Sequence, residues 1–295
     1  VILDKLFKSD QEGLNPEDYN IGKLFDFEKK ATILDSLDLA KYDILLTSSL
    51  QKYISHLTNG RLNPLKLYKN WDLKENEIDI NATVVQLLQS DSLAYKIEQL
   101  KPNHIVYKKL KKALQLINTF PKDNFKPIKF TKTILANDTN PSVIDIKKRL
   151  IYWKELQPKD SLTPVYDEET VMALKKFQSR HGLAIDAKIG PGTIASLNFS
   201  KNQRTQQILV NLERWKWYPK QMGKEHIIIN IPDYKLTLVN HYDTLRTHKV
   251  IVGRAKRKTP ILSSKLTQVV FNPTWTVPPT ILREDVIPAV LKSRS

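Results

Sequence analysis

The side chains that most often perform enzyme chemistry are sparse in this sequence. It contains no cysteine, so it can hold neither a thiol nucleophile nor a cysteine-based zinc site. Ser263 and Ser264 lack the flanking glycines of a serine nucleophile elbow, and no His, Asp and Glu residues have metal-ligand spacing. The six histidines are His56, His104, His181, His226, His241 and His248. Because no pattern attaches a nucleophile to any of them, we expect no catalytic base among them. We also expect no metal site and no cofactor.

The charge of the chain favours an anionic partner. Lys and Arg outnumber Asp and Glu by 47 to 31, which gives a net charge of +16. Nucleic acid, an acidic membrane surface and a cell-wall polymer all fit this charge, although lysines scattered along helices are typical of solvated faces. No nucleic-acid motif accompanies the charge, so we expect no nucleic-acid partner. No apolar run reaches the roughly 20 residues of a membrane span, so we expect any inner-membrane anchor to lie upstream of Val1.

Apolar residues at helical spacing dominate the first part of the chain. Residues 34–57, 84–97 and 107–117 each carry one apolar stripe. Gly60 is expected to end the first helix, and the second stripe stops near Pro102. These stripes predict the core of a helical domain, and they contain no ligand set.

A proline-containing polar stretch, residues 120–141, separates this region from a compact helical unit. Asp167 is a predicted helix N-cap, and Pro191 occupies the first turn of a short later helix. Residues 204–217 predict one more helix.

From His226 the hydrophobic period changes to that of strands. The expected elements are a buried strand at 227–231, a half-buried strand at 234–238, a hairpin turn at 240–243, a return strand at 249–252 and a further strand at 267–272. The end of the chain, from residue 285, has a helical pattern. Helices therefore come first and strands later, which predicts an α+β multidomain fold.

The strongest local pattern lies in residues 166–197. Its ordered members are Phe177 with Gln178, Gly182 with Leu183, Asp186, and Gly190 with Thr193. This set resembles the peptidoglycan-binding module of wall hydrolases and transpeptidases. The spacing also has a physical reason, since Phe177 fills a small core and Gly182 ends its helix.

The segments around this module are similar to those of the large Gram-negative-type L,D-transpeptidases, which have a YkuD-type catalytic domain. The similar segments are 211–217 (Asn-Leu-Glu-Arg-Trp-Lys-Trp), 230–232, 250–253, 259–260 and 271–279 (Phe-Asn-Pro-Thr-Trp-Thr-Val-Pro-Pro), with 60–64 and 100–107 nearer the start. The resemblance implies four units: a helical scaffold at 1–137, a three-helix peptidoglycan-binding module at 138–200, a connecting helix at 201–222, and the N-terminal part of a β-rich catalytic domain at 223–295.

The resemblance also implies a reaction. In this family a cysteine thiolate attacks the carbonyl before the terminal D-Ala of a donor stem peptide, and an acceptor's diaminopimelate amine resolves the acyl-enzyme. The family's cysteine and histidine lie downstream of the segment ending at Pro279. We therefore expect the chain to be C-terminally incomplete and inactive alone. The parent protein would be a periplasmic enzyme of cell-wall biogenesis and cell shape that forms diaminopimelate–diaminopimelate crosslinks and is a carbapenem target.

By the same resemblance, the substrate-facing residues are Asn272, Trp275, Thr276 and Pro278, which enter the region where a capping segment meets the active site. Trp275 is either a surface for the stem peptide or a core residue between sheet and cap. The basic residues of loop 254–258 either meet stem-peptide carboxylates or are simply solvated. The alternative function is a non-catalytic peptidoglycan-binding or interaction protein of the cell envelope.

Overall fold

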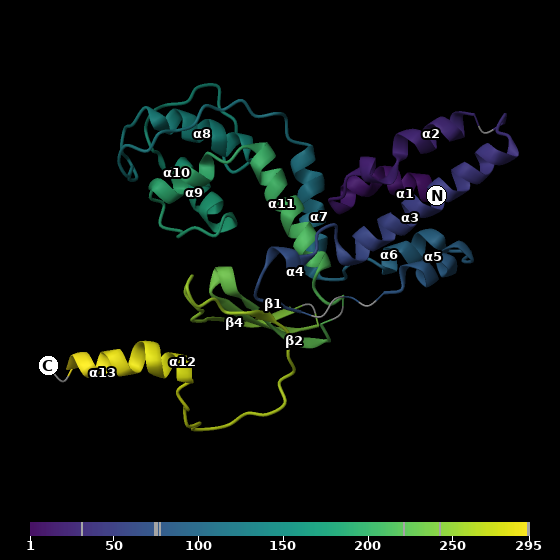
Figure 1. The fold of residues 1–295 in the computed structure, drawn as a ribbon. Coiled ribbons are helices and arrows are strands. Elements are labelled where there is room, and N and C mark those ends of the chain that lie inside the picture. The colour runs from purple at the N-terminus through teal and green to yellow at the C-terminus, as the bar shows by residue number, and fades with distance from the viewer. Residues whose placement is uncertain (31, 74–75, 77, 221, 242, 294–295) are drawn as a thin grey trace.

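A computed structural model describes residues 1–30, 32–73, 76, 78–220, 222–241 and 243–293. Helices fill the earlier part of the chain and most of the strands come late, which confirms the predicted α+β fold class. Figure 1 shows two groups of helices on either side of a central pair, α7 (Ile105–Asn118) and α11 (Lys201–Lys216), with a small sheet below them.

The N-terminal group packs around one long helix, α3 (Ser36–Asn59). Its other elements are α1 (Ile2–Phe7), α2 (Ile21–Lys29), α4 (Pro64–Leu67), α5 (Ile80–Leu88), α6 (Leu93–Gln99) and the 3-10 segments Lys8–Glu12 and Pro16–Tyr19. Leu50, Tyr53 and Ile54 of α3 lie fully buried in the core of this group. The helix predicted over 34–57 is therefore confirmed, with its apolar stripe facing inward.

Local backbone chemistry ends α3 and separates α5 from α6. Gly60 ends α3 as predicted, with φ 81° and ψ 171°, a backbone conformation that is essentially restricted to glycine. The stretch 84–97 is divided between α5 and α6 because Ser90 and Ser92 interrupt it. The Ser90 Oγ accepts a hydrogen bond from the Ser92 N–H at 3.1 Å, and such local side-chain bonds compete with helical ones.

The second group contains α8 (Ser142–Tyr152), α9 (Glu168–Arg180) and α10 (Pro191–Leu197). Leu174 and Phe177 of α9 are fully buried at its centre. The Asp167 Oδ1 accepts a hydrogen bond from the Thr170 N–H at 2.9 Å, and Pro191 is the first residue of α10. Both predicted helix starts are confirmed.

The helix predicted at 204–217 is confirmed as α11, which connects the helical groups to the sheet. It begins with a capping box, in which the Ser200 and Gln203 side chains bond each other's backbone N–H groups. It packs along α7, and Leu212 lies fully buried between α11 and its neighbours.

The sheet has the order β2 (Glu225–Asn230), β3 (Lys235–Asn240), β4 (Asp243–Lys249), with both pairs antiparallel. A tight turn containing His241 joins β3 to β4; Tyr242, predicted in the same turn, lies outside the described residues. The return strand therefore begins at Asp243, and its predicted position at 249–252 is wrong. Tyr234 has a φ of 54° and ends a 3-10 turn (Ile231–Asp233), so the half-buried strand starts one residue later than predicted.

Two other strand predictions are wrong. The strand at 227–231 is present as β2 but is not buried, since Ile227 and Ile229 are 49% and 52% exposed. No second layer covers that face within the described part of the chain. Residues 267–272 form no strand because they find no partner strand among the described residues, and Val269 and Val270 remain exposed.

One strand pair had no sequence signal. β1 (Trp71–Asp72), after the scaffold helix α4, pairs in parallel with β5 (Ile261–Leu262), so Trp71 lies opposite Ile261. The last helical elements, α12 (Pro279–Ile281), the π-helical segment Leu282–Val286 and α13 (Ile287–Ser293), match the predicted helical ending. They extend away from the other elements in Figure 1. Among the residues described, none of the helices combines the length and the apolar character that crossing a bilayer requires.

Candidate functional site

The four predicted substrate-facing residues lie on one irregular segment between β5 and α12, drawn as the long yellow loop in Figure 1. Asn272 turns this segment with a left-handed φ of 50°, and Pro278 is the N-cap of α12. Trp275 is 69% exposed. Both interpretations of Trp275, a surface for the stem peptide and a core residue between sheet and cap, stay predictions.

The basic loop 254–258 lies against the C-terminal helical segment. The Arg257 guanidinium donates hydrogen bonds to the carboxylates of Glu284 and Asp285. These bonds lower the pKa of Asp285 below its ordinary value. One of the loop's cations is therefore paired within the chain, while the other basic side chains of the loop remain exposed.

The histidines outside the sheet have structural surroundings. The His56 Nδ1 bonds the Tyr19 hydroxyl at 3.0 Å, the His104 Nε2 bonds the Pro219 carbonyl at 2.8 Å, and the His181 ring packs on Phe177. Burial lowers the pKa of His56 and of His181 to about 4, so both rings are neutral at pH 7. A neutral ring held by its neighbours is what a packing role requires.

Two histidines of the sheet region have rings that hydrogen-bond to groups close by in the sequence. The His226 Nδ1 bonds the Gly223 carbonyl at 3.1 Å, and the His241 Nδ1 bonds the Asn240 side chain at 2.6 Å. Across the described ranges, no group of three or more His, Asp and Glu residues is arranged to hold a metal ion.

The motif at 211–217 fixes α11 to the N-terminal helices. The Glu213 Oε1 accepts hydrogen bonds from the backbone N–H groups of Arg61 and Leu62, the second at 2.8 Å. The Lys216 Nζ is completely buried and donates to the Glu12 carbonyl at 3.0 Å. Glu213 and Lys216 of this motif therefore hold two separate turns of the scaffold.

Burial has a clear electrostatic effect on Lys216. It lowers the pKa of the ammonium group to about 8, while the Glu213 carboxylate, 3.8 Å away, acts in the opposite direction. The buried cation and carboxylate thus compensate each other only in part. Such a pair is retained in a fold where it fixes one arrangement of its elements.

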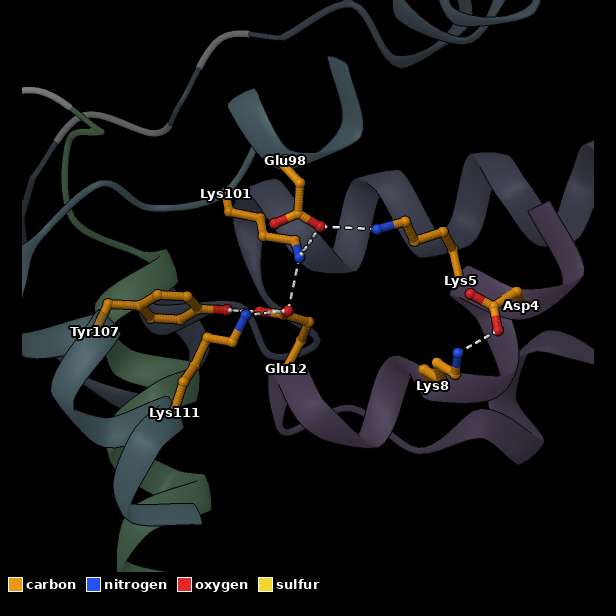
Figure 2. A network of polar contacts seen from close by, with 8 residues as sticks. All are labelled: Asp4, Lys5, Lys8, Glu12, Glu98, Lys101, Tyr107 and Lys111. Atoms are coloured by element: carbon orange, nitrogen blue, oxygen red, sulfur yellow. Dashed lines mark hydrogen bonds and ion pairs between the residues drawn. The ribbon is translucent and has the colours of Figure 1, made fainter. Parts of the chain in front are cut away.

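A second polar network is centred on the side chain of Glu12 and is shown in Figure 2. The buried Glu12 carboxylate accepts hydrogen bonds from Lys101 at 2.7 Å, from Tyr107 at 2.9 Å and from Lys111. Although burial acts to raise the pKa of Glu12, the ammonium groups of Lys101 and Lys111 hold it below its ordinary value. The sequence pattern predicted a solvated helix face for Lys111, and for this residue that interpretation is wrong.

Aromatic packing and strand pairing attach the sheet region to the scaffold. The Trp71 and Trp217 rings meet edge to face at 5.6 Å, and Ile261 packs against this cluster. The Asn70 side chain donates to the Thr259 carbonyl at 3.1 Å, next to the β1–β5 pair. The Thr259-Pro260 segment is therefore held by the scaffold.

The peptidoglycan-binding motif forms an internal hydrogen-bond network. The buried Gln178 side chain donates to Asp186 Oδ1 at 3.0 Å and to the Lys188 carbonyl at 3.2 Å, and it accepts from the Ala187 N–H at 3.0 Å. Thr193 completes the network by bonding the same carbonyl. The motif's polar residues are thus explained by the loop they hold, a role that sequence spacing alone did not distinguish from ligand binding.

Comparisons with known families agree with this arrangement. A scaffold domain model matches residues 1–114, a "Putative peptidoglycan binding domain" model matches 139–197, and an L,D-transpeptidase catalytic domain model matches 224–295. The resemblance to the L,D-transpeptidases is confirmed. The three matched domains of this L,D-transpeptidase-like chain follow one another in the order that the motifs predicted.

One curated relative supports the same family. A protein of Haemophilus influenzae named "Putative L,D-transpeptidase" is 38% identical over 84 residues. The match covers 28% of this chain and 17% of that relative. The transpeptidase-matched region contains the β2–β4 sheet, β5 and all four predicted substrate-facing residues.

Proposed function

We propose that this chain belongs to a peptidoglycan L,D-transpeptidase of the cell envelope. The observation that carries the proposal is the catalytic-domain match at 224–295, which follows a peptidoglycan-binding match at 139–197. Helix α11, which joins the two matched regions and packs along α7, supports it, because a polymer-modifying domain gains from being held near a polymer-binding module. We propose domain limits of 1–137, 138–200, 201–222 and 223–295, and a periplasmic location.

The proposed reaction is acyl transfer through a cysteine. A thiolate attacks the carbonyl that precedes the terminal D-Ala of a tetrapeptide stem, and D-Ala leaves with a proton on its amine. The side-chain amine of an acceptor diaminopimelate then attacks the thioester, forms an amide and releases the thiolate. The product is a diaminopimelate–diaminopimelate crosslink. Because this chain has no cysteine, the proposal assigns the nucleophile to residues outside these 295.

We propose that Asn272, Trp275, Thr276 and Pro278 contact the stem peptide. The exposed indole of Trp275 offers a flat apolar surface of the kind that packs on a peptide chain. The irregular backbone around it leaves main-chain N–H and C=O groups of the 263–277 segment available for hydrogen bonds to an extended ligand. The free cations of loop 254–258 lie in the same matched domain and suit the carboxylates of the stem.

Acylation by a carbapenem tests the proposed nucleophile. We expect a protein that contains this chain together with a cysteine-bearing catalytic domain to gain the mass of one carbapenem molecule, measured by intact mass spectrometry. The same protein with its cysteine changed to serine is the control and is expected to stay unmodified, as is the 295-residue chain alone. An unmodified cysteine-bearing protein that still binds peptidoglycan would favour the alternative, a non-catalytic wall-binding protein.

A further inference from the structure

The positive charge of this chain is concentrated in one short region. Residues 101–137 contain nine lysines and one aspartate, a surplus of eight, which is half of the net charge of +16. Lys101 and Lys111 of this region turn inward to Glu12. Residues 121–132 are called here the basic strap. They contain four further lysines: Lys122, Lys126, Lys129 and Lys132. All four are exposed, and no ion pair involving them is seen in the described part of the chain.

The backbone of the basic strap is held firmly although it has no regular secondary structure. The Asn198 side chain clamps Ile128 by two hydrogen bonds, at 2.8 Å to its N–H and 2.9 Å to its carbonyl. The Arg149 guanidinium donates to the Lys126 carbonyl, and the Tyr152 hydroxyl donates to the Pro121 carbonyl at 2.7 Å. The backbone of the strap therefore loses little conformational entropy when the strap meets a partner.

The composition of the strap indicates the kind of partner. Phe125 and Phe130 lie among the lysines and are 36% and 43% exposed, and the Phe125 ring also packs against Tyr152 and the Arg149 guanidinium. The single acid, Asp123, is engaged within the chain, because its carboxylate accepts a hydrogen bond from the Lys201 N–H at 2.7 Å. Lysines interleaved with phenylalanines suit an anionic lipid surface, where the ammonium groups meet headgroups and the rings enter the interface.

The absence of arginine from the strap also favours a lipid surface over a polymer with discrete carboxylates. Arginine's fork binds one carboxylate in a fixed geometry, whereas lysine acts as a mobile point charge that suits a diffuse anionic surface. In Figure 1 the chain between α7 and α8 passes over the module on the side away from the β2–β4 sheet. A bilayer on that side would leave the sheet and the 263–278 segment facing the opposite direction.

We propose that the basic strap is a peripheral binding site for an anionic phospholipid bilayer. This inference is independent of the proposed transpeptidation, since it involves no residue of the 224–295 region. The strap would hold the module at the membrane while the catalytic region reaches toward the wall. The binding would be reversible and sensitive to salt, because it depends on exposed charges.

Vesicle co-sedimentation of the 295-residue chain tests the proposal. We expect binding to phosphatidylcholine vesicles that contain about 40 mol % phosphatidylglycerol and none to pure phosphatidylcholine, with the binding lost as salt rises from about 50 to about 300 mM. Changing the four strap lysines to glutamine should weaken binding at least tenfold. Phe130→Ala should weaken it several-fold without changing the melting temperature.

A matched variant separates the strap from net charge. Lys23, Lys30, Lys66 and Lys69 are exposed lysines of the scaffold, and changing them to glutamine removes the same charge elsewhere. We expect this variant to bind vesicles within about twofold of the unchanged chain. Equal losses in the two variants, or no vesicle binding at all, would overturn the proposal. So would strap-dependent binding to isolated peptidoglycan sacculi with no binding to vesicles.

Discussion

The Glu213 carboxylate accepts the backbone N–H of Leu62 at 2.8 Å, across a sequence separation of 151 residues. The same oxygen accepts the Arg61 N–H, so one side chain of α11 closes the turn that follows α3. Glu213 and Gly60 both belong to segments that resemble the L,D-transpeptidases. This contact gives a physical reason for the resemblance of both segments, since the turn after α3 is held by α11. We call this contact between the turn and α11 the joint.

Removing the Glu213 carboxylate should loosen this joint. We expect Glu213→Ala to lower the free energy of unfolding by about 2–4 kcal/mol, because two backbone donors lose their acceptor and the buried Lys216 loses its counter-charge. Glu213→Gln keeps one acceptor oxygen and should cost less. Chemical denaturation measures both. The exposed Glu225→Ala serves as the control, and a loss from it as large as that from Glu213→Ala would contradict the assigned role.

Gly60 should be the least replaceable glycine of the scaffold. A Cβ there would lie 2.6 Å from the Glu213 Oε1 and 2.7 Å from the Trp217 Nε1, and the φ of 81° is unfavourable for any side chain. We expect Gly60→Ala to cost about 1–3 kcal/mol from backbone strain alone, and more from the contact. Gly22, inside α2, has open space around it, so Gly22→Ala should stabilise by about 0.5–1 kcal/mol. Calorimetry measures the melting temperatures of the two variants in parallel. Similar changes in melting temperature for Gly60→Ala and Gly22→Ala would contradict the special role of Gly60.

The peptidoglycan-binding module should depend on Gln178 for its stability. Gln178→Ala leaves the Ala187 N–H and the Asp186 carboxylate without their buried partner, and we expect a loss of about 2–3 kcal/mol. Gln206 lies exposed on α11, and Gln206→Ala should change the stability little. Thermal melting checks both variants. Full stability of Gln178→Ala, with loss only of sacculus binding, would instead make Gln178 a ligand-binding residue.

The stability should fall as the solution becomes mildly acidic. The pKa of His56 and of His181 is about 4 in the folded chain, against 6.5 for an ordinary histidine. Between pH 6.5 and pH 4 the unfolded chain therefore binds more protons, and the free energy of unfolding decreases as the pH falls through this range. The double variant His56→Gln, His181→Gln should show a weaker decrease than the unchanged chain in urea titrations at several pH values. An unchanged slope in the double variant would contradict this account.

Local patterns predicted most of the helices because each carries its own apolar stripe, as Leu50, Ile54 and Leu57 show in α3. The β1–β5 pair was not predictable, since two-residue strands have no period and depend on a distant partner. The strand expected at 267–272 failed for the same reason: its β-forming residues, including Val269 and Val270, find no strand to pair with among the described residues.

The candidate site was predictable in its chain positions and not in its surroundings. The motif containing Trp275 gave the position of the proposed substrate-facing segment, but the exposure of the indole is set by packing that the sequence does not encode locally. The roles of Glu213 and Lys216 were missed because their partners, Leu62 and Glu12, are remote in sequence. The signal available in the sequence was Lys216, a lysine at a position on the apolar face of the predicted helix.

The central claim is that this chain forms part of an enzyme that crosslinks two diaminopimelate residues. The most direct measurement incubates the cysteine-bearing protein with disaccharide-tetrapeptides and analyses the products by tandem mass spectrometry. We predict dimers joined by an amide between two diaminopimelates, one D-Ala released per dimer, and neither product from the cysteine-to-serine variant. A folded protein with its cysteine intact that yields no dimer and no D-Ala would contradict the claim.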